Sequence, residues 1–206
     1  MPFVTFEGVE GSGKTTQLAM AAQALRAAGR DVLATRQPGG TAIGEKIRAI
    51  LLDVGHGHLD PVSEWLLYEA DRRQHVEEVL RPAVAGGRFV LCDRYSDATE
   101  AYQQVGRGVA EHLVREVDAL ARNGLVPDLT LIYDLPVEEG LERAHLRDRH
   151  VGRFEGAALD FHRRVREAYL AIARREPGRV AVIPAGGEPE AVSRETWRVL
   201  AERFAL

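Results

Sequence analysis

The chain has 206 residues, of which 45% are hydrophobic and 28% are charged, and its formal net charge is −4. This length is typical of one domain, and the composition excludes both a disordered chain and a bundle of membrane helices. The negative net charge argues against a nucleic-acid partner, because nucleic-acid-binding domains are usually basic.

Apolar β-branched runs alternate with helical patterns along the whole chain. The runs predict strands over residues 3–7, 31–35, 89–92, 129–133 and 180–183. The helical patterns predict helices over residues 14–28, 44–52, 63–80, 110–122, 136–147, 157–175 and 188–203. Continuous apolar strands that are each followed by a helix indicate an α/β fold, with five parallel strands covered by helices on both faces. Ligands then bind at the carboxyl edge of the sheet.

The first predicted strand runs directly into a phosphate-binding loop. Residues 8–15 read Gly8-Val9-Glu10-Gly11-Ser12-Gly13-Lys14-Thr15 and match the pattern G-x-x-x-x-G-K-[ST] between a strand and a helix. The glycines let backbone N–H groups face a triphosphate, while Lys14 reaches its β- and γ-phosphates. The Thr15 hydroxyl is a ligand for Mg²⁺. We therefore expect ATP and Mg²⁺ as cofactors, bound by this loop and Thr16.

Three arginines follow strands or open helices at the expected binding edge. They are Arg36, Arg48 and Arg94. Guanidinium groups hold phosphates bidentately, so a second anion can be gripped opposite ATP. A solvated surface charge is the alternative for Arg36 and Arg48, whereas Arg94 comes directly after the strand over 89–92. The loop alone leaves ATPase, GTPase, kinase and motor functions open.

Four segments together resemble the bacterial thymidylate kinase family. They are Phe6 to Thr16, then Thr35-Arg36-Gln37-Pro38-Gly39-Gly40-Thr41, then Leu66-Leu67-Tyr68-Glu69-Ala70-Asp71-Arg72, and finally Asp93-Arg94-Tyr95 with Ala101-Tyr102-Gln103. The segments follow the family's order and span nearly the whole chain. The resemblance implies a P-loop NTPase fold, a homodimer, and transfer of the γ-phosphoryl group of ATP to thymidine 5′-monophosphate (dTMP).

The resemblance also implies roles for residues around the acceptor. Tyr68 stacks on thymine, although core packing is the alternative for such a ring. Arg72 lies four residues further on, shares the helix face of Tyr68 and hydrogen-bonds the base. Thr99 contacts the pyrimidine edge, and Tyr102 crowds out a ribose 2′-hydroxyl. Glu10 lies near the 3′-hydroxyl, and Pro38 and Gln103 complete the acceptor site.

Asp93 resembles the acidic residue that ends the third strand in this family. It would hold Mg²⁺ through water or orient Arg94, and a turn residue that ends the strand is the alternative. No general base is needed, because a phosphate monoester has a second pKa of about 6 and is already largely ionised. Catalysis is then positioning and charge neutralisation, and we expect the seven histidines to be surface or packing residues.

Nine arginines between Arg143 and Arg175 predict a lid over residues 143–156 that closes on ATP. By resemblance, Arg153 supplies the catalytic arginine, with Arg147 and Arg149 as further candidates for this role, and Arg147 and Arg149 contact ATP. The alternative is a solvated helix face, which we expect for Arg163, Arg164, Arg174 and Arg175. The catalytic set is therefore Lys14, Asp93, Arg94 and Arg153.

Three residues depart from the family pattern. Gln37 stands where a glutamate is usual, Ala98 where a serine is common, and Gly152 where the lid often has an aspartate. Gln37 removes a charge near the acceptor, and Gly152 weakens the alignment of the lid. The remaining alternatives are a kinase of the same fold that acts on another nucleotide or a deoxynucleoside, and a P-loop ATPase without an acceptor.

Three features predict a cytoplasmic protein without a membrane partner. No apolar run reaches the ~20 residues of a bilayer crossing. The N-terminal residues carry no basic leader, and Cys92 is the only cysteine. The patch Gly55-His56-Gly57-His58 is read as a polar loop rather than a metal site, because no carboxylate or cysteine lies at ligand spacing.

Overall fold

In the computed structural model, which describes residues 2–53, 55, 59–147 and 159–206, five parallel strands form one sheet. The strands lie side by side in the order β2-β3-β1-β4-β5. Their bounds are β1 (Phe3–Gly8), β2 (Val32–Arg36), β3 (Phe89–Asp93), β4 (Leu129–Asp134) and β5 (Val180–Pro184). The predicted parallel sheet is confirmed, and each strand lies within one residue of its expected bounds.

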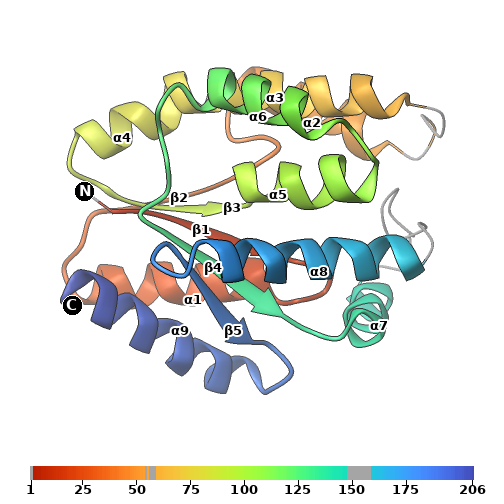
Figure 1. Cartoon of the computed structure of the whole chain (residues 1–206). Helices are drawn as coiled ribbons and strands as arrows, with labels where there is room; N and C mark the ends of the chain where they lie inside the picture. Colours follow the sequence, from red (N-terminus) through yellow and green to blue (C-terminus); the bar gives the residue numbers. More distant parts are fainter. Residues whose placement is uncertain (1, 54, 56–58, 148–158) are drawn as a thin grey trace.

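Helices cover both faces of the sheet (Figure 1). On one face, α1 (Lys14–Ala27) packs against β1, β2 and β3 and beside α9 (Pro189–Phe204). On the other face, α4 (Arg81–Ala85) contacts β3, α5 (Ser96–Thr99) contacts β1, and α8 (Leu159–Arg175) contacts β4 and β5. This arrangement agrees with the prediction of two covered faces.

An outer row of helices lies beyond this second face, at the top of Figure 1. It contains α2 (Ala42–Leu52), α3 (Pro61–His75) and α6 (Glu111–Arg122), with α2 packed on α3 and α3 packed on α6. Along the chain, α3 continues into the π-helix η2 (Val76–Leu80) and then into α4. None of the helices among the described residues is long and apolar enough to cross a membrane.

The main difference from the predicted elements lies between β3 and α6. No helix was predicted there, but the structure has α5, which continues into the π-helix η3 (Glu100–Gly106). Ala101 and Tyr102 are buried in one cluster with Phe161 and Tyr169 of α8. Tertiary packing against α8 therefore forms this segment, and a local pattern cannot reveal such packing.

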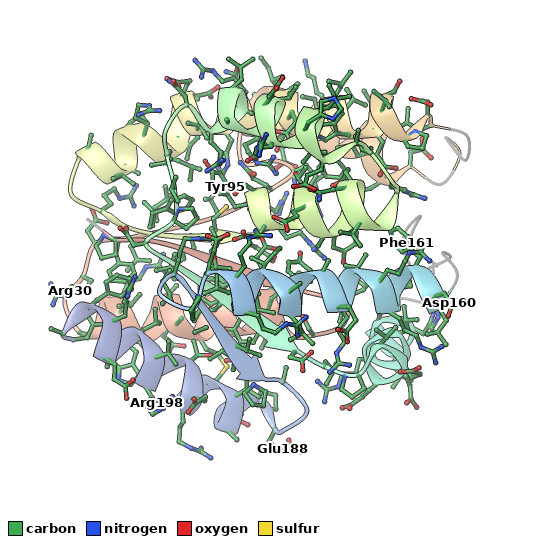
Figure 2. All side chains as sticks on the ribbon, viewed as in Figure 1. Arg30, Tyr95, Asp160, Phe161, Glu188 and Arg198 are labelled. Carbon is green, nitrogen blue, oxygen red and sulfur yellow. The ribbon has the colours of Figure 1, made fainter. Side chains whose placement is uncertain are left out.

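Side chains of β1 alternate between the two faces of the sheet. Val4 and Phe6 join the core beneath α1 and α9, whereas Phe3 packs with Val90 on the opposite face. Glu7 follows Phe3 on that opposite face and is fully buried. Figure 2 shows Tyr95 between the sheet and the helices above it, with Arg198 on the exposed side of α9.

Candidate active site

The loop between β1 and α1 leads into the N-terminus of α1. Gly11 and Gly13 have φ angles of 71° and 82°, in the left-handed region that glycine adopts without a steric penalty. Gly13 is the N-cap of α1 and offers no side chain to cap it. The amides of the first turn and the positive end of the helix therefore form a ready site for an anion.

Lys14 is buried at the start of α1, and its ammonium group donates a hydrogen bond to the Val9 carbonyl at 3.2 Å. Burial and the nearby Arg94 lower the pKa of Lys14, while Glu10 and Asp93 oppose this shift. A polyphosphate beside the ammonium group would supply further negative charge and favour its charged form. Lys14 is thus placed to meet a phosphate.

Thr15 and Asp93 lie together although 78 positions separate them, because β1 pairs with β3 and aligns Phe6 with Asp93. The Thr15 hydroxyl donates to the Asp93 carboxylate at 2.5 Å. Hydroxyl and carboxylate oxygens suit Mg²⁺, which commonly takes only one or two protein ligands together with phosphate and water. Within the described ranges, no group of three or more His, Cys, Asp or Glu could hold a metal. The oxygens of Thr15 and Asp93 therefore fit Mg²⁺ shared with a phosphate.

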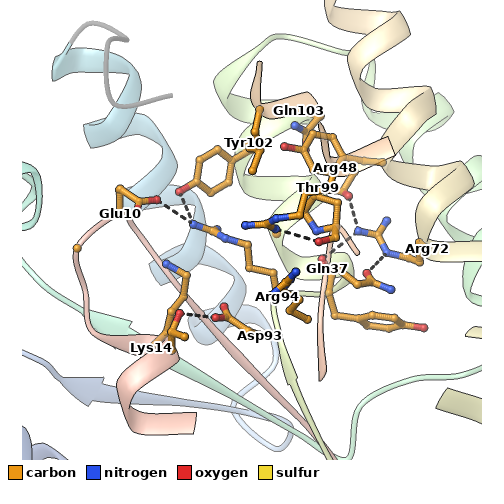
Figure 3. A pocket seen from close by; sticks show the side chains of 18 of the residues that line it. Glu10, Lys14, Gln37, Arg48, Arg72, Asp93, Arg94, Thr99, Tyr102 and Gln103 are labelled. Carbon is orange, nitrogen blue, oxygen red and sulfur yellow. Dashed lines mark hydrogen bonds and ion pairs between the residues drawn. The ribbon is translucent and has the colours of Figure 1, made fainter. Parts of the chain in front are cut away.

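Arg94 lies in the middle of the site, between Lys14 and the acceptor residues (Figure 3). Its guanidinium donates to the hydroxyls of Tyr169 at 3.3 Å and Tyr102 at 3.2 Å, and it lies 3.7 Å from the Glu10 carboxylate. Although burial opposes the charge, the two tyrosines and Glu10 raise the pKa of Arg94. Arg94 is therefore a fixed cation that can bridge two anions.

Two further arginines, which were predicted to hold the acceptor, line the same cavity. Arg36 donates to both carboxylate oxygens of Glu45 at 2.9 Å, and Arg48 donates to the Pro38 carbonyl at 2.9 Å. Burial and the charge of Arg36 lower the pKa of Arg48. The mutual repulsion of these cations favours a bound anion. Sequence reasoning missed Glu45, which would compete with that anion for Arg36.

Tyr68 is half-buried and lines the same cavity, so it is not a core residue. Arg72, four residues further along α3, also lines the cavity but is 2% exposed. Its guanidinium donates to Gln37 at 3.3 Å and Thr99 at 2.9 Å, both in the cavity wall. Arg72 therefore holds two wall residues, and its contact with a base stays a prediction.

Arg72 is also anchored by two carboxylates and a carbonyl. It donates to Glu69 at 2.7 Å, to Asp118 of α6 at 3.2 Å and to the Tyr95 carbonyl at 3.0 Å. Although burial opposes the charge, Glu69 and Asp118 raise the pKa of Arg72. Asp118 was missed from the sequence because the fold brings it from a distant helix, whereas Glu69 lies three residues before Arg72 on α3, so its helical spacing was an available signal.

These groups line one cavity of about 510 Å³. Of the predicted site residues, it includes Glu10, Gly11, Gly13, Lys14, Thr15, Thr16, Arg36, Pro38, Arg48, Tyr68, Arg72, Asp93, Arg94, Thr99, Tyr102 and Gln103. Gly8, Val9 and Ser12 are buried within the loop and do not line the cavity. The structure thus brings together, in one cavity, residues that were predicted for the donor and for the acceptor and that lie far apart in the sequence.

The cavity also contains four residues that were not predicted to bind a ligand: Gln37, Leu52, Tyr95 and Ala98. Gln37 and Tyr95 directly follow predicted arginines, and Ala98 precedes Thr99, so adjacency was an available signal for these three. Leu52 is the last residue of α2 and carried no such signal.

The predicted lid falls largely outside the described residues. Helix α7 (Val137–Arg147) ends where the predicted ATP contacts begin, and Arg149, Gly152 and Arg153 lie outside the described ranges. Arg143 donates to the Ala185 carbonyl at 3.1 Å, which anchors α7. The roles of Arg147, Arg149 and Arg153 stay predictions, and most of the Gly55–His58 patch also lies outside the described residues.

The arginines expected on a solvated face follow that expectation where ion pairs are described. Arg163 pairs with Glu138 at 2.6 Å and Arg175 pairs with Glu100 at 2.7 Å, and both arginine side chains are about half exposed. Exposed pairs of this kind contribute little to stability, because water and salt screen them. They therefore give no reason to place these two arginines in the site.

Comparison with known proteins relates the chain to one family. A family model described as thymidylate kinase matches residues 6–196. A thymidylate kinase of Solidesulfovibrio magneticus is 52% identical over 96% of this chain and 98% of its own, and one of Trichlorobacter lovleyi is 47% identical over 99% of each. The crystal structure of a thymidylate kinase from Ehrlichia chaffeensis aligns with a TM-score of 0.80 at 32% identity, covering 97% of this chain and 98% of that one.

Proposed function

Because the chain belongs to the thymidylate kinase family, we propose that it transfers the γ-phosphoryl group of ATP to dTMP and releases thymidine 5′-diphosphate. It is an ATP-dependent kinase. A kinase of another nucleotide or deoxynucleoside and a P-loop ATPase without an acceptor are not favoured, because relatives matched over nearly their full length are named thymidylate kinases. The observation that carries the proposal is Arg94, which shares one cavity with Lys14 and the acceptor arginines.

On the donor side, the loop amides and Lys14 hold the triphosphate of ATP, and Mg²⁺ is held by Thr15 and Asp93. When bound, the metal neutralises phosphate charge and aligns the oxygens for transfer. The hydrogen bond between Thr15 and Asp93 supports this assignment, since it brings two hard oxygen donors to the loop.

On the acceptor side, Arg36, Arg48 and Arg94 hold the phosphate of dTMP. Donor and acceptor are both anions, so they must be forced together against mutual repulsion. Arg94 offsets this repulsion because it can face both phosphates at once. The acceptor phosphate attacks without a general base, because its oxygen is already largely ionised at neutral pH.

The nucleoside of dTMP lies against the opposite wall of the cavity. Tyr68 stacks on thymine, Arg72 and Thr99 contact its edge, and Tyr102 excludes a 2′-hydroxyl. Their shared place in the cavity wall supports these roles. Pro38, Gln103 and Glu10 complete the acceptor contacts.

The whole chain acts as a single P-loop kinase domain with a lid over residues 143–156. Arg153 acts on the transferring phosphoryl group from this lid, while Arg147 and Arg149 contact ATP. An arginine from a lid can stabilise the charge of the transition state and close the site against water.

The kinase is a cytoplasmic homodimer that pairs through the outer row α2, α3 and α6. Each of these three helices exposes a large apolar side chain, namely Ile43 at 52%, Leu66 at 47% and Leu120 at 71%. Exposed apolar patches of this kind mark association surfaces. The expected mass in solution is twice the 22.7 kDa of one chain, and Leu66→Asp should reduce it toward that of one chain.

A panel of acceptors tests the proposed reaction directly. With ATP and Mg²⁺, turnover on dTMP should exceed turnover on uridine, cytidine or guanosine monophosphate by at least about 100-fold, because a polar site rejects analogues that leave its groups unpaired. Equal rates on another acceptor would remove the dTMP assignment. ATP hydrolysis without an acceptor at the rate of the best transfer would favour an ATPase.

A further inference from the structure

Arg94 occupies an unusual backbone conformation that needs support. Its φ angle is 70°, in the left-handed region, where the Cβ of a residue other than glycine is sterically strained. The amide of the next residue, Tyr95, donates to one carboxylate oxygen of Glu7 at 2.6 Å. Glu7 therefore holds the peptide that directly follows Arg94 and fixes this turn at the end of β3.

The other carboxylate oxygen of Glu7 acts on the far end of the Arg94 side chain. It accepts a hydrogen bond from the Tyr169 hydroxyl at 2.7 Å, and that hydroxyl accepts one from the Arg94 guanidinium at 3.3 Å. The two oxygens of one carboxylate thus control both the backbone and the guanidinium of Arg94. Since Glu7 accepts from the Tyr169 hydroxyl, the oxygen of that hydroxyl stays free to accept from Arg94.

Neither Glu7 nor Tyr169 can reach a substrate. Both are buried, with exposures of 0% and 1%, and neither lines the cavity. Any influence on the reaction must therefore pass through Arg94. A buried carboxylate is costly unless it is hydrogen-bonded and paired, and here both oxygens are engaged in holding Arg94.

We propose that Glu7 and Tyr169 are positioning residues that hold Arg94 between the two phosphate sites. The proposal rests on the proposed function, because the transfer from ATP to dTMP is what requires a cation at this point. Catalysis of phosphoryl transfer depends on positioning, and a displacement of about 1 Å can cost about 100-fold in rate. The hydroxyl of Tyr169, remote from both substrates, becomes a determinant of turnover.

The test removes that hydroxyl with Tyr169→Phe and compares it with a matched control. Tyr133 is equally buried, and its hydroxyl bonds to Thr196 of α9, on the opposite face of the sheet. Tyr169→Phe should lower kcat by about tenfold or more while the KM for ATP changes less than about twofold. Tyr133→Phe should destabilise the fold by a similar amount and leave kcat unchanged.

A double-mutant cycle separates positioning from a general effect on the fold. In an Arg94→Ala background, Tyr169→Phe should cause no further loss of kcat, because the group that it positions is absent. Glu7→Gln should shift kcat in the same direction as Tyr169→Phe. If Glu7→Gln does not fold, the tyrosine variants still decide the matter.

The outcomes distinguish the positioning role from the reaction itself. Equal kcat for Tyr169→Phe and Tyr133→Phe, or additive losses with Arg94→Ala, would overturn the positioning role. Failure of the wild-type chain to phosphorylate dTMP would instead overturn the proposed function.

Discussion

Gly140 of α7 permits a close backbone contact with the phosphate loop, and Gly140→Ala should disturb ATP binding from outside the loop. A Cβ at Gly140 would lie 2.4 Å from the Glu10 carbonyl oxygen, whereas real Cβ contacts essentially never fall below 3.0 Å, so the gap must widen by about 0.6 Å. Both groups at this contact belong to the backbone, Gly140 in helix α7 and Glu10 in the phosphate loop. Neither can turn aside as a side chain could.

Two effects of opposite sign decide the stability of Gly140→Ala. Alanine in place of glycine inside a helix gains about 1 kcal/mol. Overpacking a closed contact costs about 1–3 kcal/mol, and here the contact is between backbone atoms, so the upper part of this range applies. We expect a net loss of about 1–2 kcal/mol, which lowers Tm by about 2–8 °C for a chain of this size.

The functional consequence follows from the displacement of Glu10 and its neighbours. Loop amides shifted by several tenths of an ångström should raise the KM for ATP by about tenfold, with a smaller change in the KM for dTMP. Gly178→Ala is the matched control, because a Cβ there meets nothing within 4 Å. Steady-state kinetics and thermal unfolding of both variants measure the effect. An unchanged KM for ATP with a raised Tm in Gly140→Ala would refute this reasoning.

Four further outcomes follow from the site and its surroundings. Lys14→Ala should lower kcat by about 100-fold or more without loss of folding, measured by transfer assay and circular dichroism, and retention of most activity would mean that the site is misplaced. Tyr68→Ala should raise the KM for dTMP by about tenfold at nearly unchanged kcat, because stacking on a base contributes about 1–3 kcal/mol, and an unchanged KM would return this ring to a structural role. Arg153→Ala should reduce kcat by about 1,000-fold with little change in ATP affinity, and an unchanged rate would assign the catalytic role to Arg147 or Arg149 instead. Burial lowers the pKa of His75 from 6.5 to about 4, so on acidification His75 is protonated in the unfolded chain before it is protonated in the folded chain. The contribution of His75 to stability is therefore full above pH 6.5 and is lost as the pH falls toward 4. In urea unfolding, the stability difference between wild type and His75→Gln should therefore shrink by about 2 kcal/mol from pH 7.5 to pH 5, and a constant difference would contradict a neutral buried His75.

The sheet and the phosphate loop could be predicted because their causes are local. Strands buried on both faces read as short apolar runs, and the loop needs only glycines, a lysine and a flanking strand and helix. Arg94 was predictable for a similar reason, since a polar residue directly after a buried strand lies at the binding edge of a parallel sheet.

The partners of the site arginines could not be predicted because the fold brings them from distant segments. Asp118 reaches Arg72 from α6, and Tyr169 reaches Arg94 from α8. The π-helix η3 was missed for the same reason, since the packing of Tyr102 on α8 determines it. A sequence pattern shows the periodicity of a helix or strand but not which other elements it packs against.

The central claim is that one cavity holds the polyphosphate of ATP on the loop of residues 8–15, opposite a second phosphate held by arginines. A crystal structure with dTMP and a non-hydrolysable ATP analogue tests it most directly. The account predicts the triphosphate on the loop amides and Lys14, with the dTMP phosphate against Arg36, Arg48 and Arg94. Either nucleotide bound outside this cavity would contradict it.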